Sequence, residues 1–252
     1  PSASPRSYTH YEQLRKPLLD ATIALADPDF WHHSGYSLAG WQDPRAHPTL
    51  AQKLVSDLLL WSEPPSTSRA IHERLLAAQV TARYGREQVL EWYLNSADYG
   101  HFAYGAAAAA ELYFGKPVAQ LDLGEAALLA AVSQAPALNP IDAPQAAELM
   151  RLETLQIMQK MGLITADEAA QAAAHPPLIL SPSMQASLAP AFITLALDQL
   201  GKQFNRERID RGGLDILTTL DYDLQLQAGC VVETQEIGRA QSELQSHLNL
   251  VC

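Results

Sequence analysis

The chain has 252 residues, of which 48% are hydrophobic and 7% aromatic, and its formal net charge at pH 7 is −11. This composition favours packed helices over a β-sandwich, whose strands would need more β-branched and aromatic residues. The acidic balance argues against a general nucleic-acid binder, because such proteins normally present a basic face to the phosphates.

The length allows one large domain, or one domain and part of a second. No apolar run approaches the roughly 20 residues that a membrane-spanning helix needs. Cys230 and Cys252 have neither the spacing of a zinc site nor the surroundings of a nucleophile, so we predict no metal site. Because the chain lacks an initiator Met and a signal peptide and ends abruptly, we expect it to be a piece of a longer protein.

Helical patterns dominate the first two hundred residues. Segment 9–26 predicts an opening helix that ends before Asp27 and Pro28. The next two predicted helices, 47–61 and one that begins at Ser68, carry apolar residues at helical spacing. The residues expected to face the core are Leu50, Leu54, Leu58 and Trp61 in the first of these, and Ile71, Leu75, Ala78 and Ala82 in the second.

Helix signals continue to about residue 204. Asp122 and Glu125 form a capping-box pattern, which predicts a helix over 123–134. Other helical patterns occupy 86–95, 102–115, 144–161, the residues after Thr165, and 190–204.

The character of the chain changes near residue 205. A Gly-Gly turn is followed by Leu214, Ile216 and Thr218 in an alternating pattern that is typical of a short strand. We therefore predict a mainly α-helical domain over 1–205 and a β-containing fragment over 206–252.

Few polar residues indicate chemistry by themselves. Asp27 and Asp29 follow an apolar helix, where acids commonly form turns or caps. Adjacent His32 and His33 would diverge on a helix or strand, so a two-histidine metal site is not expected. Glu73 has the spacing of an ordinary helix ion pair, which by itself predicts a solvated side chain.

Two later residues also have a structural interpretation. Asn95 fits a helix C-cap, and Tyr113 fits a helical core better than a stacked ligand. Composition and periodicity alone thus indicate a helical domain with an attached β piece, and no particular activity.

Segment 87–140 contains, in order, EQVLEWYLN, AAAAAELYFGK, LDLGEAALLA and APALNP. It closely resembles the peptidoglycan glycosyltransferase (transglycosylase) domain of class A penicillin-binding proteins, family 51 of the glycosyltransferases, where such motifs follow in the same order. RLETLQIMQKMGLIT at 151–165 resembles the next motif of that domain. RGGLDILTTLDYDLQLQA at 211–228 is similar to the linker that leads into the transpeptidase domain.

The resemblance implies a lysozyme-like helical fold at the outer face of the bacterial cytoplasmic membrane, with the membrane anchor and the transpeptidase domain outside the present sequence. It implies that lipid II is polymerised into glycan strands with loss of undecaprenyl pyrophosphate. The implied partners are lipid II, the glycan strand, the membrane surface and other cell-wall synthesis proteins, and no nucleic acid. No cofactor is implied beyond a divalent cation that could accompany the pyrophosphate.

The implied reaction needs a base that takes the proton of the acceptor hydroxyl, and positive groups that stabilise the departing pyrophosphate. In the family, a Glu in the motif E-D-x-x-F-x-x-H-x-G is this base. ADPDFWHHSG aligns with the motif without a gap and keeps Asp27, Phe30 and His33, but it has Ala26 at the base position. A methyl group accepts no proton, and positioned acid–base catalysis is worth about 10²- to 10⁴-fold in rate.

The second family motif, GGST-x-TQQL-x-KN, corresponds to AHPTLAQKLVSD. Thr49, Gln52 and Leu54 are kept, whereas Ser56 and Asp57 replace the family's Lys and Asn. The domain therefore lacks one positive charge that the family directs toward the pyrophosphate.

The third family motif, R-K-x-x-E, corresponds to RAIHE. Arg69 and Glu73 are kept, but Ala70 replaces the Lys, so a second cation is lost. Lys53, one turn from the first missing Lys, could replace a cation, and Asp27 or Asp29 could act as base through a water.

Two functions follow from these departures. The domain is either a glycosyltransferase with impaired catalysis or a non-catalytic module that binds lipid II, glycan or partner proteins. Apart from the resemblance, an unrelated helical interaction domain is a third alternative. The resemblance gives Glu73 and Asp27 as catalytic candidates. Its substrate-binding candidates are Phe30, Thr49, Gln52, Lys53, Arg69, Asn95 and Tyr113.

Overall fold

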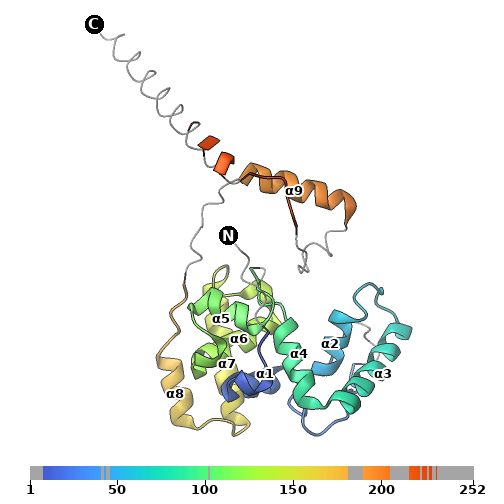
Figure 1. Ribbon diagram of the computed structural model, residues 1–252. Coiled ribbons are helices and arrows are strands. Elements are labelled where there is room, and N and C mark those ends of the chain that lie inside the picture. Colours follow the sequence, from blue (N-terminus) through green and yellow to red (C-terminus); the bar gives the residue numbers. More distant parts are fainter. Residues whose placement is uncertain are drawn as a thin grey trace, which may run out of the picture. The chain divides into compact units, whose positions relative to one another are not determined.

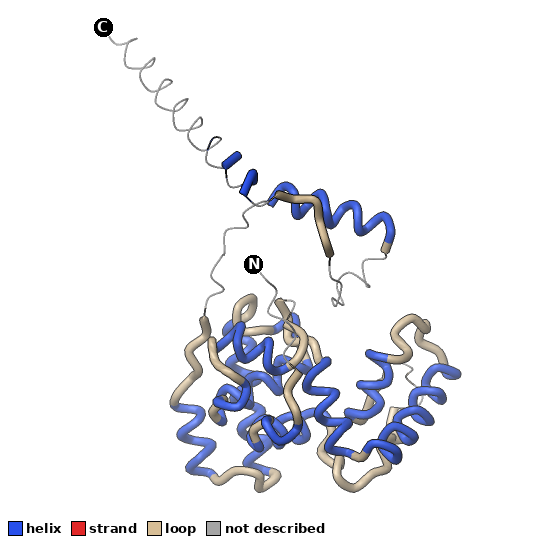
Figure 2. Tube along the Cα trace, viewed as in Figure 1, coloured by secondary structure: helices blue, strands red, loops and turns tan. Residues whose placement is uncertain are grey.

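The computed structural model describes residues 8–40, 43, 46–101, 103–180, 190–204, 216–221, 223–225, 227–228 and 231. The chain divides into two compact units, residues 1–183 and 184–252. Helices and loops make up the described part of the first unit, which confirms the prediction of a mainly α-helical fold (Figure 2). Among the described residues, no helix combines the length and the apolar character that crossing a bilayer requires.

The helices of the first unit match the predicted segments in order. They are η1 (Tyr11–Gln13), α1 (Lys16–Ala26), α2 (Leu50–Leu58), α3 (Thr67–Tyr84), α4 (Arg86–Ser96), α5 (Ala106–Phe114), η2 (Val118–Gln120), α6 (Leu123–Gln134), η3 (Pro136–Leu138), α7 (Pro144–Lys160) and α8 (Ala166–Ala174). The described part of the second unit contains α9 (Pro190–Gln203).

The helices of the first unit pack in two groups. In one group α2 packs against α3 and α4, and in the other α6 packs against α1 and α7, with α8 beside α7. Helix α4 also contacts α5 and η1, so it connects the two groups (Figure 1). The end of α1 and the start of α2 lie where these groups meet, and the candidate site is built there.

Helix α6 forms the centre of the larger group. Ten of its residues are buried, and four of these are alanines, whose small side chains let α1 and α7 approach closely. Its predicted capping box is present: the Asp122 carboxylate accepts from the Glu125 amide, and the Glu125 carboxylate accepts from the Asp122 amide.

The predicted opening helix is interrupted. Segment 9–26 contains the short helix η1 and then α1, which begins at Lys16, with Leu14 and Arg15 in extended conformation between them. Pro17 explains the break, because it has no amide hydrogen to continue a helix from the preceding turn, whereas it is tolerated in the first turn of α1, where that amide would have no helical partner.

The apolar stripes predicted for α2 and α3 are partly wrong. Leu50 and Leu54 are buried, but Leu58 is 47% exposed, since α2 ends there. On α3 the predicted face is turned outward, with Ile71 at 55% and Leu75 at 57% exposure. The buried residues of α3 are Arg69, Ala70, Glu73, Arg74, Ala77 and Thr81.

A fully buried arginine joins α7 to α8. Arg151 is 0% exposed and donates from its Nε and Nη2 atoms to the two carboxylate oxygens of Glu148, each at 2.7 Å. Its Nη1 donates to the carbonyl oxygen of Ala172 at 2.7 Å, near the end of α8. The planar guanidinium thus satisfies a helix C-terminus and a carboxylate together, which an ammonium group cannot do in the same geometry.

The strand predicted over 214–219 is not found among the described residues of that segment. Residues 216–221 have no regular secondary structure, and Leu214 and Asp215 lie outside the described residues. An alternating pattern needs a neighbouring strand to pair its backbone groups, and the described residues of the second unit form helices and loops (Figure 2). The predicted boundary near residue 205 remains a prediction.

Replacing Arg151 by Met should lower the free energy of unfolding by about 3 kcal/mol, because Glu148 and the end of α8 lose their buried partner. Urea denaturation measures this change. Lys160→Met, at the exposed end of the same helix, should stay within about 0.5 kcal/mol of the parent. A similar small effect for Arg151→Met would show that the buried network contributes little.

Candidate active site

The carboxylate of Asp27 joins three parts of the chain at the end of α1. Asp27 is 3% exposed, and its Oδ2 accepts a hydrogen bond of 3.0 Å from the amide of Leu50, the first residue of α2. Its Oδ1 lies 2.8 Å from Nε2 of His33 in the following loop. A carboxylate at a helix N-terminus satisfies a free amide and interacts favourably with the helix dipole, so Asp27 fixes the start of α2.

The loop after Asp27 is fixed from several sides. His33 Nδ1 accepts from the amide of Gly35, and Arg86 at the start of α4 donates to the carbonyl oxygens of Phe30 and His33. Gly35 has a φ of +90°, and a Cβ there would lie 2.1 Å from Oγ1 of Thr81. Only glycine fits this position, which brings the loop against α3.

Helix α2 begins with a second set of contacts. Thr49 caps the helix by accepting from the amide of Gln52, and its hydroxyl donates to the carbonyl oxygen of Gly35. The Gln52 side chain accepts from the amide of Ser37 and is fully buried. Both residues are therefore held in place by the loop that follows α1.

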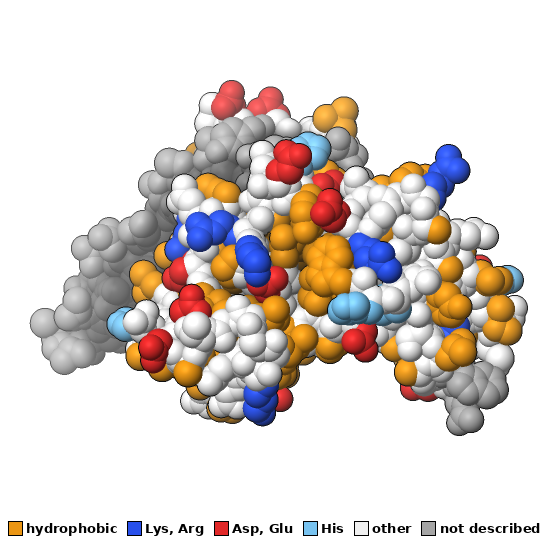
Figure 3. Space-filling model, turned by 90° about the horizontal axis from the view of Figure 1, so that it is seen from below, with side chains coloured by type: hydrophobic (Ala, Val, Ile, Leu, Met, Phe, Trp, Pro, Cys, Tyr) orange, Lys and Arg blue, Asp and Glu red, His pale blue; other side chains and the backbone are white. Residues whose placement is uncertain are grey.

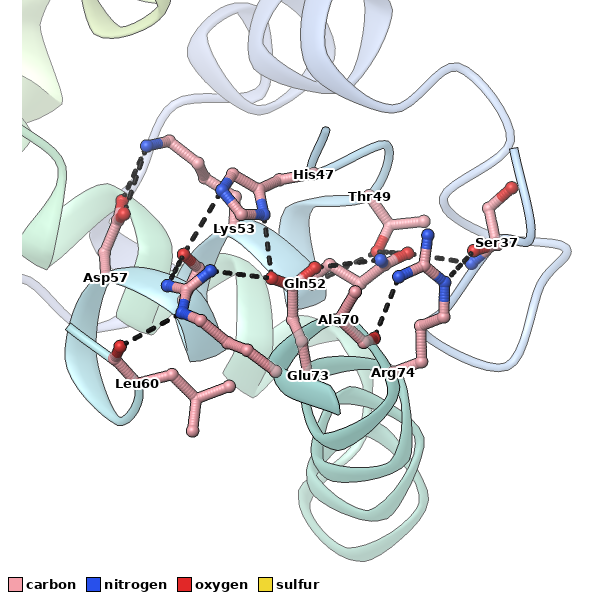
Figure 4. Close-up of polar contacts among 12 residues, drawn as sticks. Ser37, His47, Thr49, Gln52, Lys53, Asp57, Leu60, Ala70, Glu73 and Arg74 are labelled. Carbon is pink, nitrogen blue, oxygen red and sulfur yellow. Dashed lines mark hydrogen bonds and ion pairs between the residues drawn. The ribbon is translucent and has the colours of Figure 1, made fainter. Parts of the chain in front are cut away.

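Five side chains gather between α2 and α3, and we call them the α2–α3 polar cluster: His47, Gln52, Ser56, Arg69 and Glu73 (Figure 4). Glu73 is 1% exposed; its Oε1 accepts from Gln52 Nε2 at 3.0 Å, and its Oε2 lies 2.8 Å from His47 Nδ1 and 3.7 Å from Arg69 Nη1. The solvated position predicted from helical spacing is wrong for Glu73. A buried carboxylate is retained where opposite charges and donors compensate for its lost hydration.

Arg69 occupies the place beside Ser56. Its Nη2 donates to the Ser56 hydroxyl at 2.7 Å, and its Nε donates to the carbonyl oxygen of Leu60. The Ser56 hydroxyl also lies 3.3 Å from Nε2 of His47. Arg69 and His47 therefore both direct nitrogen atoms to the position where the resembling family has a Lys.

Two other cations near the cluster also contact protein groups. Lys53 is 42% exposed and forms an ion pair of 2.9 Å with Asp57 one turn later. Arg74 is buried and donates to the carbonyl oxygens of Ser37 and Ala70 (Figure 4). Ala70 is 4% exposed, so a long charged side chain there would need the surrounding structure to move.

The structure brings together some of the sequence-predicted site residues and not others. Thr49, Gln52, Arg69 and Glu73 lie in or beside the cluster, with Lys53 at its exposed edge. Ala26 is half-buried against the core at the end of α1. The remaining candidates are framework side chains: Phe30 is 2% exposed, and the hydroxyl of fully buried Tyr113 donates to the carbonyl oxygen of Tyr99.

Asn95 holds the beginning of the described chain against α4. Its side chain accepts from the amide of Thr9 and donates to the carbonyl oxygen of the same residue, each at 2.8 Å. The carboxylate of Glu91, one turn earlier, accepts from the Tyr8 hydroxyl and the Tyr11 amide. The same carboxylate lines a cavity of about 310 Å³.

These contacts shift two pKa values. Burial raises the pKa of Tyr8 to about 12, with a further contribution from its hydrogen bond to Glu91. Burial alone would raise the pKa of Glu91, but the hydrogen bonds that its carboxylate accepts outweigh this and lower the pKa. The stability that Glu91 contributes is therefore present above its ordinary pKa and is lost as pH falls through the lowered value.

Sequence reasoning missed His47 and the position of Ser56. His47 precedes α2 in a loop whose sequence has no site pattern. The motif comparison identifies Ser56 only as the residue that replaces the family's Lys. The available signal was their spacing of nine residues, which is not diagnostic because the contact depends on how the loop returns to α2. Only the fold shows that His47 bridges Ser56 and Glu73.

The family model described as Transglycosylase matches residues 2–161 of the chain. This is more than half of the sequence and includes the end of α1, the polar cluster and α4 to α7. The chain belongs to the transglycosylase family. The resemblance found in the sequence motifs is thereby confirmed: this is a transglycosylase domain of the kind found in class A penicillin-binding proteins.

Several curated proteins are similar to this transglycosylase domain. Penicillin-binding protein 1A of Aquifex aeolicus (strain VF5) is 32% identical over 232 residues, which cover 87% of this chain and 32% of that protein. Penicillin-binding protein 1A of Vibrio cholerae serotype O1 is 31% identical, with 86% and 28% covered. Penicillin-binding protein 2D of Bacillus subtilis (strain 168) is 28% identical, with 92% and 36% covered.

A solved structure, Penicillin-binding protein 1A from Haemophilus influenzae, aligns with a TM-score of 0.49 at 20% identity and covers 81% of this chain and 22% of that one. The chain spans about a third of the length of the curated relatives described above.

Asp27→Ala should lower the free energy of unfolding by about 3 kcal/mol, because the amide that begins α2 and the ring of His33 lose a buried partner. Thermal and urea unfolding measure the change. Asp29→Ala is the matched control, since Asp29 lies two residues later and is exposed. Equal stability of the two variants would contradict the structural role of Asp27.

Acid should release residues 8–13 from α4 before the domain unfolds. Protonation of Glu91 removes the negative charge of the carboxylate to which the Tyr8 hydroxyl and the Tyr11 amide donate. Hydrogen exchange at the Tyr11 amide, followed as pH is lowered below the ordinary Glu pKa, measures this release. Glu91→Gln should remove most of the pH dependence, whereas Glu87→Gln, an exposed acid on the same helix, should leave it. Unchanged pH dependence in Glu91→Gln would refute the assignment.

Proposed function

We propose that this transglycosylase domain binds lipid II at its sugar diphosphate and polymerises lipid II units into glycan strands, with loss of undecaprenyl pyrophosphate and with strongly impaired catalysis. The observation that carries the proposal is the end of α1. Ala26 stands at the family's base position, and the adjacent Asp27 uses both carboxylate oxygens to hold His33 and α2.

The chemistry explains why this arrangement matters. Attack of the acceptor hydroxyl on the anomeric carbon requires a group that takes the hydroxyl proton. Asp27 could serve only by giving up contacts that fix the fold, and Asp29 is exposed and two residues further along the loop. Loss of the positioned base costs about 10²- to 10⁴-fold in rate, so slow polymerisation is the expected outcome.

The polar cluster supports ligand binding. Arg69 offers a guanidinium, which suits phosphate oxygens, and Gln52 and Thr49 supply neutral polar groups beside it. Lys53 at the exposed edge is the cation that a ligand reaches with the smallest loss of buried contacts, because its partner Asp57 is also exposed. A diphosphate would compete with Asp57 for this ammonium.

A non-catalytic binding module is the second candidate. It is favoured because the cations of the cluster are already bonded within the protein: Arg69 to Ser56 and Leu60, and Lys53 to Asp57. A site of this kind retains shape and some affinity while it lacks the free positive charge that stabilises a leaving pyrophosphate.

A divalent cation at the diphosphate remains a prediction. Within the described ranges, no group of three or more His, Cys, Asp or Glu side chains is arranged to hold a metal ion. Mg²⁺ is often held by one or two carboxylates together with substrate phosphates. The residues present would therefore take such an ion only together with its phosphate ligand.

We also propose that this domain works at the outer face of the bacterial cytoplasmic membrane, next to other proteins of cell-wall synthesis. The exposed apolar side chains of α2, the following turn and α3 support a membrane contact: Leu58, Leu59, Trp61, Ile71 and Leu75. Hydrophobic side chains reach the surface at the end of the domain that carries these helices (Figure 3). Such a grouping on one side is typical of a binding surface.

Ala26→Glu should raise the rate of glycan polymer formation from lipid II by about 10²-fold or more, because it restores a carboxylate at the base position. Polymerisation of fluorescent lipid II in detergent micelles, followed by gel electrophoresis, measures the rate. This single substitution is preferable to adding Lys at positions 56 and 70, which are buried and border Arg69.

Ala26→Gln is the matched control, since its side chain has nearly the same size and shape as that of Glu but carries no charge and accepts no proton. It should remain at the parental rate. Adding Glu73→Gln to Ala26→Glu should abolish the gain. A parental rate equal to that of Ala26→Glu would contradict the impairment, and a lack of lipid II binding in both proteins would contradict the proposed function.

A further inference from the structure

The charge of the α2–α3 polar cluster depends on one imidazole. Arg69 carries one positive charge and Glu73 one negative charge, and the two lie 3.7 Å apart. The Lys53–Asp57 pair beside them adds no net charge, and nearby Arg74 adds a positive charge that does not change with pH. The cluster is therefore neutral when His47 is neutral, and it carries a net charge of +1 when His47 is protonated.

His47 is placed to carry this charge. Its Nδ1 lies 2.8 Å from Oε2 of Glu73, an arrangement that becomes a buried ion pair on protonation. Its Nε2 lies 3.3 Å from the Ser56 hydroxyl, to which Arg69 also donates. The side chain of His47 is 18% exposed, whereas those of Arg69 and Glu73 are 8% and 1% exposed, so solvent and ligands reach the imidazole first.

We propose that His47 is the switchable cation of the α2–α3 polar cluster, which binds a phosphate group when the imidazole is protonated and loses affinity for it when the imidazole is neutral. The inference rests on the proposed function, because it concerns the same diphosphate site. It adds a residue that provides positive charge where Ser56 and Ala70 provide none.

The groups that face His47 come from two helices. Helix α2 contributes the Ser56 hydroxyl, with Lys53 and Asp57 paired at its exposed side, and α3 contributes Arg69 and Glu73 (Figure 4). Arginine keeps its charge at all relevant pH values. Histidine is the side chain whose charge ordinarily changes between pH 5 and 8, so a pH-dependent difference in phosphate affinity between the parent and a His47 variant is attributed to the imidazole.

A different role for His47 predicts a different pH dependence. If the ring only covers Glu73, its removal exposes this carboxylate and weakens phosphate binding to the same extent at every pH. If the ring is the cation, its removal weakens binding, and only at acidic pH. The pH dependence of the effect therefore separates the two roles.

The test measures binding of inorganic pyrophosphate by isothermal titration calorimetry at pH of about 5.5 and about 8. Pyrophosphate itself titrates in this range, so the parent is compared with His47→Ala at each pH. At the lower pH we expect the parent to bind pyrophosphate about tenfold more tightly than His47→Ala does, which corresponds to one charge-assisted contact. At the higher pH we expect the two proteins to bind equally.

Two further variants sharpen the comparison. His47→Arg keeps a permanent charge and should bind as tightly as the protonated parent at both pH values. His72→Ala, an exposed histidine on the same helix as Glu73, should match the parent throughout.

Each outcome decides the question. Equal affinity of the parent and His47→Ala at both pH values, tighter binding by His47→Ala, or the same loss of affinity at both pH values overturns the role of His47. If Arg69→Gln nevertheless weakens pyrophosphate binding, the proposed diphosphate site stands without a role for His47. If neither pyrophosphate nor lipid II binds the parent at either pH, the proposed function and this inference both fail.

Discussion

The buried carboxylate of Asp27 is the contact on which the site depends. One oxygen holds the first amide of α2 and the other holds His33, so the end of α1, the following loop and the second helix are fixed by one side chain. Because burying a charge is costly, such a carboxylate remains where each of its oxygens is satisfied. The position of α2, and with it the polar cluster, follows from this junction.

The cluster itself is built on the same constraint. Glu73 is almost fully buried and is compensated by Gln52, Arg69 and His47 from three different places in the chain. Removal of any partner would leave part of a buried charge unpaired. This explains how the arrangement persists beside Ala26: the cluster contributes to the packing of α2 on α3, whatever the rate of catalysis.

The exposed and buried faces of α3 show why function and folding are linked here. Its apolar residues Ile71 and Leu75 are exposed, and its charged residues Arg69, Glu73 and Arg74 are buried. An ordinary amphipathic helix has the reverse pattern. The helix gains its place in the fold from polar contacts to α2 and to the preceding loop, and it leaves apolar side chains exposed.

The sequence by itself determined the helical fold, the order of the helices and the capping boxes, because these depend on residues three to four apart. Its motifs also indicated the family, and their alignment predicts that Ala26 occupies the base position. Only the tertiary structure decided that Glu73 is buried, that Asn95 and Tyr113 are framework residues, and that His47 faces Ser56. Those contacts join residues from separate elements, and helical periodicity contains no information on which face of α3 meets α2.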